Sequence, residues 1–259
     1  MMKRTLLCTL LAFLLALQLN AQGTGSLPCY RIDASLDGRI PVTIAFQKDK
    51  NGIIAGYIYY PKAKNPSPIL IVGTTNNYDG ADNYHLCEYQ DDGIITGIIY
   101  LQTKNRTTTG TWMNPKTLQD LQMKNITSSR QLPQWFKESA LKPEDPGNIG
   151  KKYSFQQWHQ GYESLMGGHI TFRAAGKNKV HFECANVRHN IAEGKSQKGR
   201  PAELKGNRFE YRHVNECGYG FKATFYQCFV VLQTITGNES LECFGAGASF
   251  EGVYIKVKQ

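Results

Sequence analysis

Short hydrophobic runs that alternate with polar residues follow turn signals along most of the chain. Residues 51–60, NGIIAGYIYY, nearly repeat as residues 92–101, DGIITGIIYL, and an Asp-containing turn precedes each copy. Asn-Gly and Asp-Gly accept the positive φ values of tight hairpin turns. The Ile, Tyr and Thr residues that follow suit a half-buried strand. We therefore predict that both copies are the same turn-and-strand unit of a β-meander.

The sixth position of each copy is a glycine, Gly56 or Gly97. Glycine is costly inside a strand unless the sheet bends or another backbone approaches closely, so the pair predicts a strongly curved sheet. Eight strands are predicted around these units, near 29–36, 39–47, 53–60, 68–74, 83–90, 94–102, 109–113 and 117–126. Their short connections favour sequential antiparallel pairing. The first half is therefore predicted to be an eight-stranded meander, either an up-and-down barrel or a curled sandwich.

The pattern changes after Ile126. Residues 132–141 predict a short helix with a proline in its first turn, and 142–147 predict a linker. Further strands are predicted near 169–175, 179–187, 208–214, 219–226, 228–235 and 249–257, with a long polar loop over 190–206. The chain is thus predicted to be all-β, with two successive antiparallel domains over 22–141 and 142–259.

The N-terminus has the pattern of an export signal. An apolar run over 6–19 follows Lys3 and Arg4, and Ala21 is a small residue before a plausible cleavage point. The run has about fourteen residues, whereas a membrane-spanning helix needs about twenty. We expect residues 1–21 to be a cleaved signal peptide, and the mature chain to be secreted or periplasmic and not to span the membrane. An uncleaved N-terminal anchor is the alternative.

Six cysteines follow the signal, and an even number in an exported protein predicts oxidised pairs. They are Cys29, Cys87, Cys184, Cys217, Cys228 and Cys243. If the chain divides near residue 145, Cys29 can pair only with Cys87, while three pairings stay open among the other four. No Cys-x-x-Cys occurs, which argues against a thioredoxin-like redox site or a zinc knuckle.

The formal net charge is +9, and the basic excess is densest over 188–212. This segment predicts an anion-binding patch for an acidic protein, an anionic lipid or a glycan, with a solvated basic loop as the alternative. Nucleic acid is disfavoured by export. The candidate basic residues are Arg188, Lys195, Lys198, Arg200 and Lys205.

Aromatic residues at helical spacing over 155–162 predict a helix packed on the second β-domain. In that helix, Trp158 and Tyr162 would be candidates for stacking on a sugar ring.

The sequence carries none of the hydrolase and nucleotide-binding signatures, such as Gly-x-Ser-x-Gly or His-Glu-x-x-His. We therefore predict no catalytic residue, no cofactor and no metal site. The predicted function is a non-enzymatic binding or inhibitory module of the cell envelope, which recognises an anionic or glycan-type partner through loops. The alternative is a glycan-active hydrolase, which needs a pair of facing carboxyl groups; the candidates for that pair are Glu88, Glu183 and Glu210.

Two short motifs carry a family resemblance. Residues 95–97 (Ile-Thr-Gly) with 110–112 (Gly-Thr-Trp) resemble small exported β-domains of Gram-negative bacteria, and 243–247 with 252–254 resemble the closing strand of another such group. The layout, disulfide-linked β-domains behind a signal peptide, is similar to that of the periplasmic lysozyme inhibitors. The Ser-Gly-Ser-Gly loop with which those inhibitors enter the lysozyme cleft has no match in this sequence.

Overall fold

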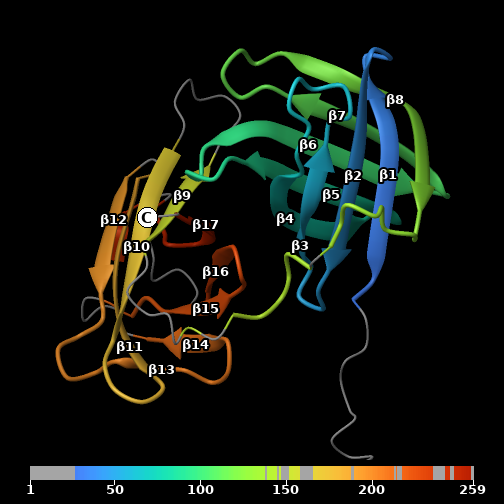
Figure 1. The fold of residues 1–259 in the computed structure, drawn as a ribbon. Helices are drawn as coiled ribbons and strands as arrows, with labels where there is room; N and C mark the ends of the chain where they lie inside the picture. The colour runs from blue at the N-terminus through green and yellow to red at the C-terminus, as the bar shows by residue number, and fades with distance from the viewer. Residues whose placement is uncertain are drawn as a thin grey trace, which may run out of the picture.

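The computed structural model describes residues 27–137, 139–144, 146, 152–157, 166–187, 190–212, 214, 218–235, 243–245 and 248–257. These residues form two antiparallel β units that lie side by side, a closed barrel and a second sheet (Figure 1). No helix in this described part of the chain is long and apolar enough to span a membrane. The signal region 1–21 and the predicted site residues Trp158, Tyr162 and Arg188 lie outside the described residues, as does Cys217.

The barrel confirms the predicted eight-stranded meander. Each strand pairs with the next, and the first pairs with the last, which closes the sheet. The strands are β1 (Cys29–Leu36), β2 (Ile40–Lys48), β3 (Ile53–Tyr59), β4 (Ile69–Tyr78), β5 (Ala81–Tyr89), β6 (Ile95–Lys104), β7 (Thr107–Met113) and β8 (Asp120–Ser129). Alternate side chains from these strands fill the interior with a hydrophobic core that includes Phe46, Ile71 and Leu86.

The two sequence repeats form the same local structure. The turn glycine has a positive φ in both, 78° at Gly52 and 87° at Gly93. In both turns the glycine N–H donates to the carbonyl oxygen of the residue three positions earlier. β3 follows the first turn and β6 follows the second, so the repetition reflects the barrel's architecture.

The second unit is a nine-stranded sheet with the order β12-β11-β10-β9-β17-β16-β15-β14, and β13 pairs with β11. It curls around an aromatic core, so that Phe182 of β11 stacks on Phe209 of β14 with 6.1 Å between the ring centroids. The strands are β9 (Lys152–Gln157), β10 (Met166–Ala174), β11 (Lys179–Val187), β12 (Ile191–Lys195), β13 (Ala202–Glu203), β14 (Arg208–Tyr211), β15 (Phe221–Phe225), β16 (Phe229–Thr234) and β17 (Gly252–Lys256).

Two predictions of local structure for the second half were wrong. The aromatic stripe begins in a strand, β9, because residues 152–157 pair with both β10 and β17. The predicted loop 190–206 contains β12 and β13. β12 escaped notice because its core-facing residues, Ala192 and Gly194, are too small to give a clear hydrophobic alternation.

The predicted helix over 132–141 is also absent from its described residues, which form turns and irregular chain. Its aromatic side chains pack on the barrel instead. Trp135 lies 5.4 Å from Tyr59 and Phe136 lies 5.5 Å from Tyr57, measured between ring centroids. Tertiary packing therefore outweighs the local helical preference of this segment.

A hydrophobic cluster joins the barrel to the second sheet. Its members include Ile53, Val72 and Ile98 on the outside of the barrel, and Phe229 and Ile255 on the second sheet. A hydrogen bond reinforces the contact, because the Tyr226 hydroxyl donates to Asp49 Oδ2 over 3.0 Å. Asp49 belongs to the first repeated turn, so that turn serves both the hairpin and the contact between the two units.

The predicted Cys29–Cys87 bridge was wrong, since both residues are free thiols. Ile32 on β1 and Leu86 on β5 face the barrel core. Cys29 and Cys87 stand an odd number of positions from them on the same strands, so their side chains face outward. β1 and β5 are separated by three strands in either direction around the barrel. Two outward side chains on opposite walls cannot reach the short Cα separation that a disulfide requires.

Among the described cysteines of the second sheet, Cys184 is also a free thiol, whereas Cys243 is disulfide-bonded. Two bridges in the second half, as predicted from the even cysteine count, are therefore not formed. Burial raises the pKa of the Cys87 thiol to about 12, and burial likewise raises that of Cys184 to about 12. Both thiols are consequently poor nucleophiles near neutral pH, because the thiolate is the reactive form.

Cys87 and Cys184 should resist a thiol reagent at pH 8 in the native protein and react fully after unfolding without reductant. The physical reason is that unfolding removes the burial that raises both pKa values. Labelling followed by peptide mass spectrometry measures this for each cysteine. The prediction fails if either position becomes labelled only after a reductant is added, because that cysteine would then be disulfide-bonded.

Candidate functional site

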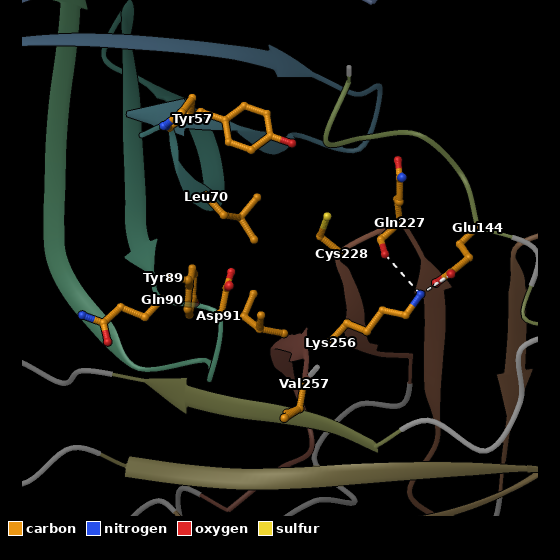
Figure 2. A pocket seen from close by; sticks show the side chains of 12 residues that line it. Tyr57, Leu70, Tyr89, Gln90, Asp91, Glu144, Gln227, Cys228, Lys256 and Val257 are labelled. Carbon is orange, nitrogen blue, oxygen red and sulfur yellow. Dashed lines mark hydrogen bonds and ion pairs between the residues drawn. The ribbon is translucent and has the colours of Figure 1, made fainter. Parts of the chain in front are cut away.

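A cavity of about 640 Å³ lies between the barrel and the second sheet (Figure 2). Tyr57, Leu70 and Tyr89 line it from the barrel, and Ile255 lines it from β17. Small-molecule sites are common at junctions between packed structural units. Whether the cavity suits an ionic ligand depends on the charges of its lining residues.

On one wall of this cavity, the positive and negative side chains pair with each other. The Lys256 amine forms an ion pair with Glu144 and donates to the Gln227 carbonyl oxygen over 3.3 Å, as Figure 2 shows. The Tyr153 hydroxyl donates to the same carboxylate over 3.4 Å. Burial, and next the charge of Glu144, raise the pKa of Tyr153. This wall contributes to the contact between the two units and offers no surplus positive charge to an anion.

The surplus charge gathers in a groove of about 580 Å³ on the second sheet, which we call the cationic groove. The segment around β13 forms one side of it, and β14 with the neighbouring β15 forms the other. Outward positions of these strands carry the charges, since the intervening Phe209 and Tyr211 are buried in the core. Its basic residues are Arg200, Lys205, Arg208, Arg212 and Lys222.

Two carboxylates also line the cationic groove, Glu203 and Glu210, so five basic residues face two acidic ones. Glu203 already forms a salt bridge with Lys179 of β11, with 3.6 Å between Nζ and Oε1. In the described part of the chain, none of the five basic residues of the groove forms a salt bridge. The groove therefore carries a net positive charge, which no salt bridge to its basic residues neutralises among the described residues.

The basic residues predicted from the sequence to bind an anion fall into two places. Arg200 and Lys205 lie in the cationic groove, whereas Lys195 and Lys198 line an adjacent pocket of about 250 Å³. Sequence reasoning did not single out Lys222. The feature that could have identified Lys222 is its place at an alternate, outward position of β15, where its cross-strand partner is Glu210.

The adjacent pocket also holds a serine and a histidine in contact. His181 Nδ1 lies 2.7 Å from Ser196 Oγ, which also accepts a hydrogen bond from the Phe182 N–H over 3.2 Å. Ser196 N–H in turn donates to the Phe182 carbonyl oxygen. Ser196 thus extends the hydrogen-bond ladder between β11 and β12 by one residue pair. This structural role explains why Ser196 is buried.

The three carboxylates considered for a hydrolase lie in three different surroundings. Glu88 is buried in the barrel, Glu183 lines the 250 Å³ pocket, and Glu210 lines the cationic groove. No group of three or more His, Cys, Asp or Glu residues placed to hold a metal ion occurs within the described ranges.

Comparisons with protein families, curated proteins and solved structures find no match to this chain. The site is therefore interpreted from its own geometry.

Proposed function

We propose that this protein is an exported, non-enzymatic binding module of the cell envelope, and that its cationic groove recognises an acidic partner, an acidic glycan chain in the first instance. The observation that carries the proposal is the groove's net positive charge, five basic residues against two acidic ones in a concave surface of about 580 Å³. Such a surface attracts anions over a range set by the ionic strength.

The arrangement of the charges supports an extended ligand. Arg208 and Arg212 are four residues apart along and just beyond β14, and Lys222 lies on the neighbouring strand. Guanidinium groups bind carboxylate and sulfate oxygens through paired N–H donors, so several anionic groups along one chain could be held at once. The export pattern of residues 1–21 supports an envelope location for such a ligand.

Reversal of three basic residues of the groove tests this proposal. The triple variant Arg200→Glu, Lys205→Glu and Arg208→Glu should bind immobilised dextran sulfate about tenfold or more weakly than the unmodified protein, and with a shallower dependence on NaCl. All three side chains are exposed, so the fold should persist. Elution from the resin along a salt gradient measures the effect.

A second triple variant controls for net charge alone. Lys62→Glu, Lys64→Glu and Lys116→Glu change the charge equally at exposed positions in barrel connections, away from the groove. These changes should weaken retention much less. Equal losses in the two variants would contradict a defined site. Parallel columns of polyglutamate, and vesicles containing phosphatidylglycerol, would show whether an acidic protein or an anionic lipid binds better than the polysaccharide.

A further inference from the structure

The outer face of β4–β7 divides into an apolar half and a polar half. One row of outward side chains, Val72, Cys87, Ile98 and Met113, packs in the cluster that joins the barrel to the second sheet. Beyond that row the same face is polar and exposed in large part, and it is hollowed into a groove of about 530 Å³. This volume lies within the range of about 300–1,000 Å³ typical of ligand sites.

The polar groove is built from two rows of directly opposed residues. The first row, across β4–β8, is Thr74, His85, Tyr100, Thr111 and Gln122. The second row, across β4–β7, is Asn76, Asn83, Gln102 and Thr109. Every one of these side chains points outward because the barrel core takes the alternate positions, such as Leu86 and Leu101.

An aromatic pair stands at the centre of the first row. The rings of His85 and Tyr100 stack with 4.8 Å between centroids and 3° between planes. This distance is close to the usual spacing of about 4.8 Å between neighbouring strands, so both rings stand upright from the sheet. The outer faces of the pair therefore point toward β4 and β7, and Tyr100 is 40% exposed. An exposed aromatic face of this kind can stack on the C–H groups of a sugar ring.

Hydrogen bonds orient the amides of the second row. Asn83 Nδ2 donates to Asn76 Oδ1 over 3.3 Å, and Gln102 Nε2 donates to Asn83 Oδ1 over 2.9 Å. The chain of amides leaves Asn76 Nδ2 as a donor at one end and Gln102 Oε1 as an acceptor at the other, with no partner for either atom among the described residues. A sugar hydroxyl both donates and accepts, and so can bond to each of these groups.

The lining of the polar groove carries no ionised side chain. None of its twelve described residues is Asp, Glu, Lys or Arg, although charged residues usually make up about a quarter to a third of the surface of a soluble domain. Burial lowers the pKa of His85 from its usual range, so the imidazole is neutral near pH 7. The groove thus offers hydroxyl, amide and aromatic groups and lacks a charge with which to hold an ionic ligand.

We propose that this polar groove is a binding site for a neutral oligosaccharide, whose ring stacks on the His85–Tyr100 pair while its hydroxyl groups bond to the amide row and the threonines. This site lies on the barrel and is independent of the cationic groove on the second sheet. The protein would then hold an uncharged glycan on one unit and an acidic partner on the other.

Titration with maltohexaose, cellohexaose and chitohexaose, followed by calorimetry, tests the site. At least one of these neutral probes should bind the unmodified protein. Tyr100→Ala should weaken that binding by about tenfold because the stacking face is lost, and Gln102→Ala should weaken it by about threefold to tenfold. Both residues are exposed, so thermal unfolding should change little.

Tyr78→Ala is the matched control, because Tyr78 is a tyrosine on β4 of the same barrel, 78% exposed and outside the groove. It should bind the probe as the unmodified protein does. The proposal is overturned if no probe binds at millimolar concentration, or if Tyr100→Ala binds as well as Tyr78→Ala. Retention of Tyr100→Ala on dextran sulfate should stay unchanged, which separates this site from the proposed acidic-partner site.

Discussion

Replacement of Gly56 by alanine should prevent the barrel from reaching its native structure, with a loss of about 4 kcal/mol or more in the free energy of unfolding. A Cβ atom at this position would lie 2.1 Å from the Ala45 carbonyl oxygen and 2.5 Å from the Phe46 Cα. Both atoms belong to the backbone of β2, which is hydrogen-bonded to β3. No side-chain rotation can relieve such a clash. Urea denaturation followed by circular dichroism measures the loss.

Gly80→Ala provides the control for this variant. Gly80 lies in the turn between β4 and β5 with a φ of 69°, and a Cβ atom there would meet nothing within 4 Å. Gly80→Ala should therefore lower the free energy of unfolding by only about 1 kcal/mol, because the sole penalty is a residue with a Cβ atom in the left-handed backbone conformation. If Gly56→Ala were no more destabilising than Gly80→Ala, the close approach of β2 to β3 would not be the reason for the glycine.

Glu88→Ala should lower the free energy of unfolding by about 3 kcal/mol or more, because it leaves three donors in the barrel without their acceptor. The Tyr60 hydroxyl donates to Glu88 Oε2 over 2.7 Å, and the Trp112 indole N–H donates to the same oxygen over 3.3 Å. The Thr96 hydroxyl donates to Oε1 over 2.8 Å. Only 4% of Glu88 is exposed, so water cannot readily replace the carboxylate.

Glu88→Gln separates the hydrogen bonds from the charge. The amide oxygen keeps an acceptor for Tyr60 and Trp112, and the Thr96 hydroxyl can turn to accept from the amide N–H, so the cost should be about 1 kcal/mol. Burial first, and the Glu88 charge next, raise the pKa of Tyr60. Alkaline titration of Glu88→Gln should therefore show that pKa lowered but still above its ordinary value. Equal destabilisation by Ala and Gln would contradict the hydrogen-bond account.

The sequence by itself determined the all-β class and the order of the barrel strands. Turn dipeptides and two-residue alternation act over short distances, so they could be recognised without any knowledge of tertiary contacts. β1 and β11 have the bounds predicted for them, 29–36 and 179–187. Arg200 and Lys205 are close together along the chain, so the sequence could indicate that they lie near each other, and both line the cationic groove. Anion binding by these residues stays a prediction.

The tertiary structure alone decided what the repeated glycines do. Gly56 and Gly97 occupy equivalent places in the two repeats, yet a Cβ atom at Gly56 would meet the backbone of β2, whereas one at Gly97 would meet the side chains of Trp112 and Glu88. The repeat predicted a special glycine in each copy. The neighbours that require it come from other strands, and no local pattern specifies them.

The candidate sites depended on the tertiary structure for the same physical reason. The polar groove joins residues from five strands between Thr74 and Gln122, and none of them stands out within its own strand. Whether two outward cysteines can meet likewise depends on how a sheet closes, which is why the Cys29–Cys87 pairing was wrong. Alternation along a strand determines which side chains leave the core, but only the closure and curl of the sheets determine which of them come together.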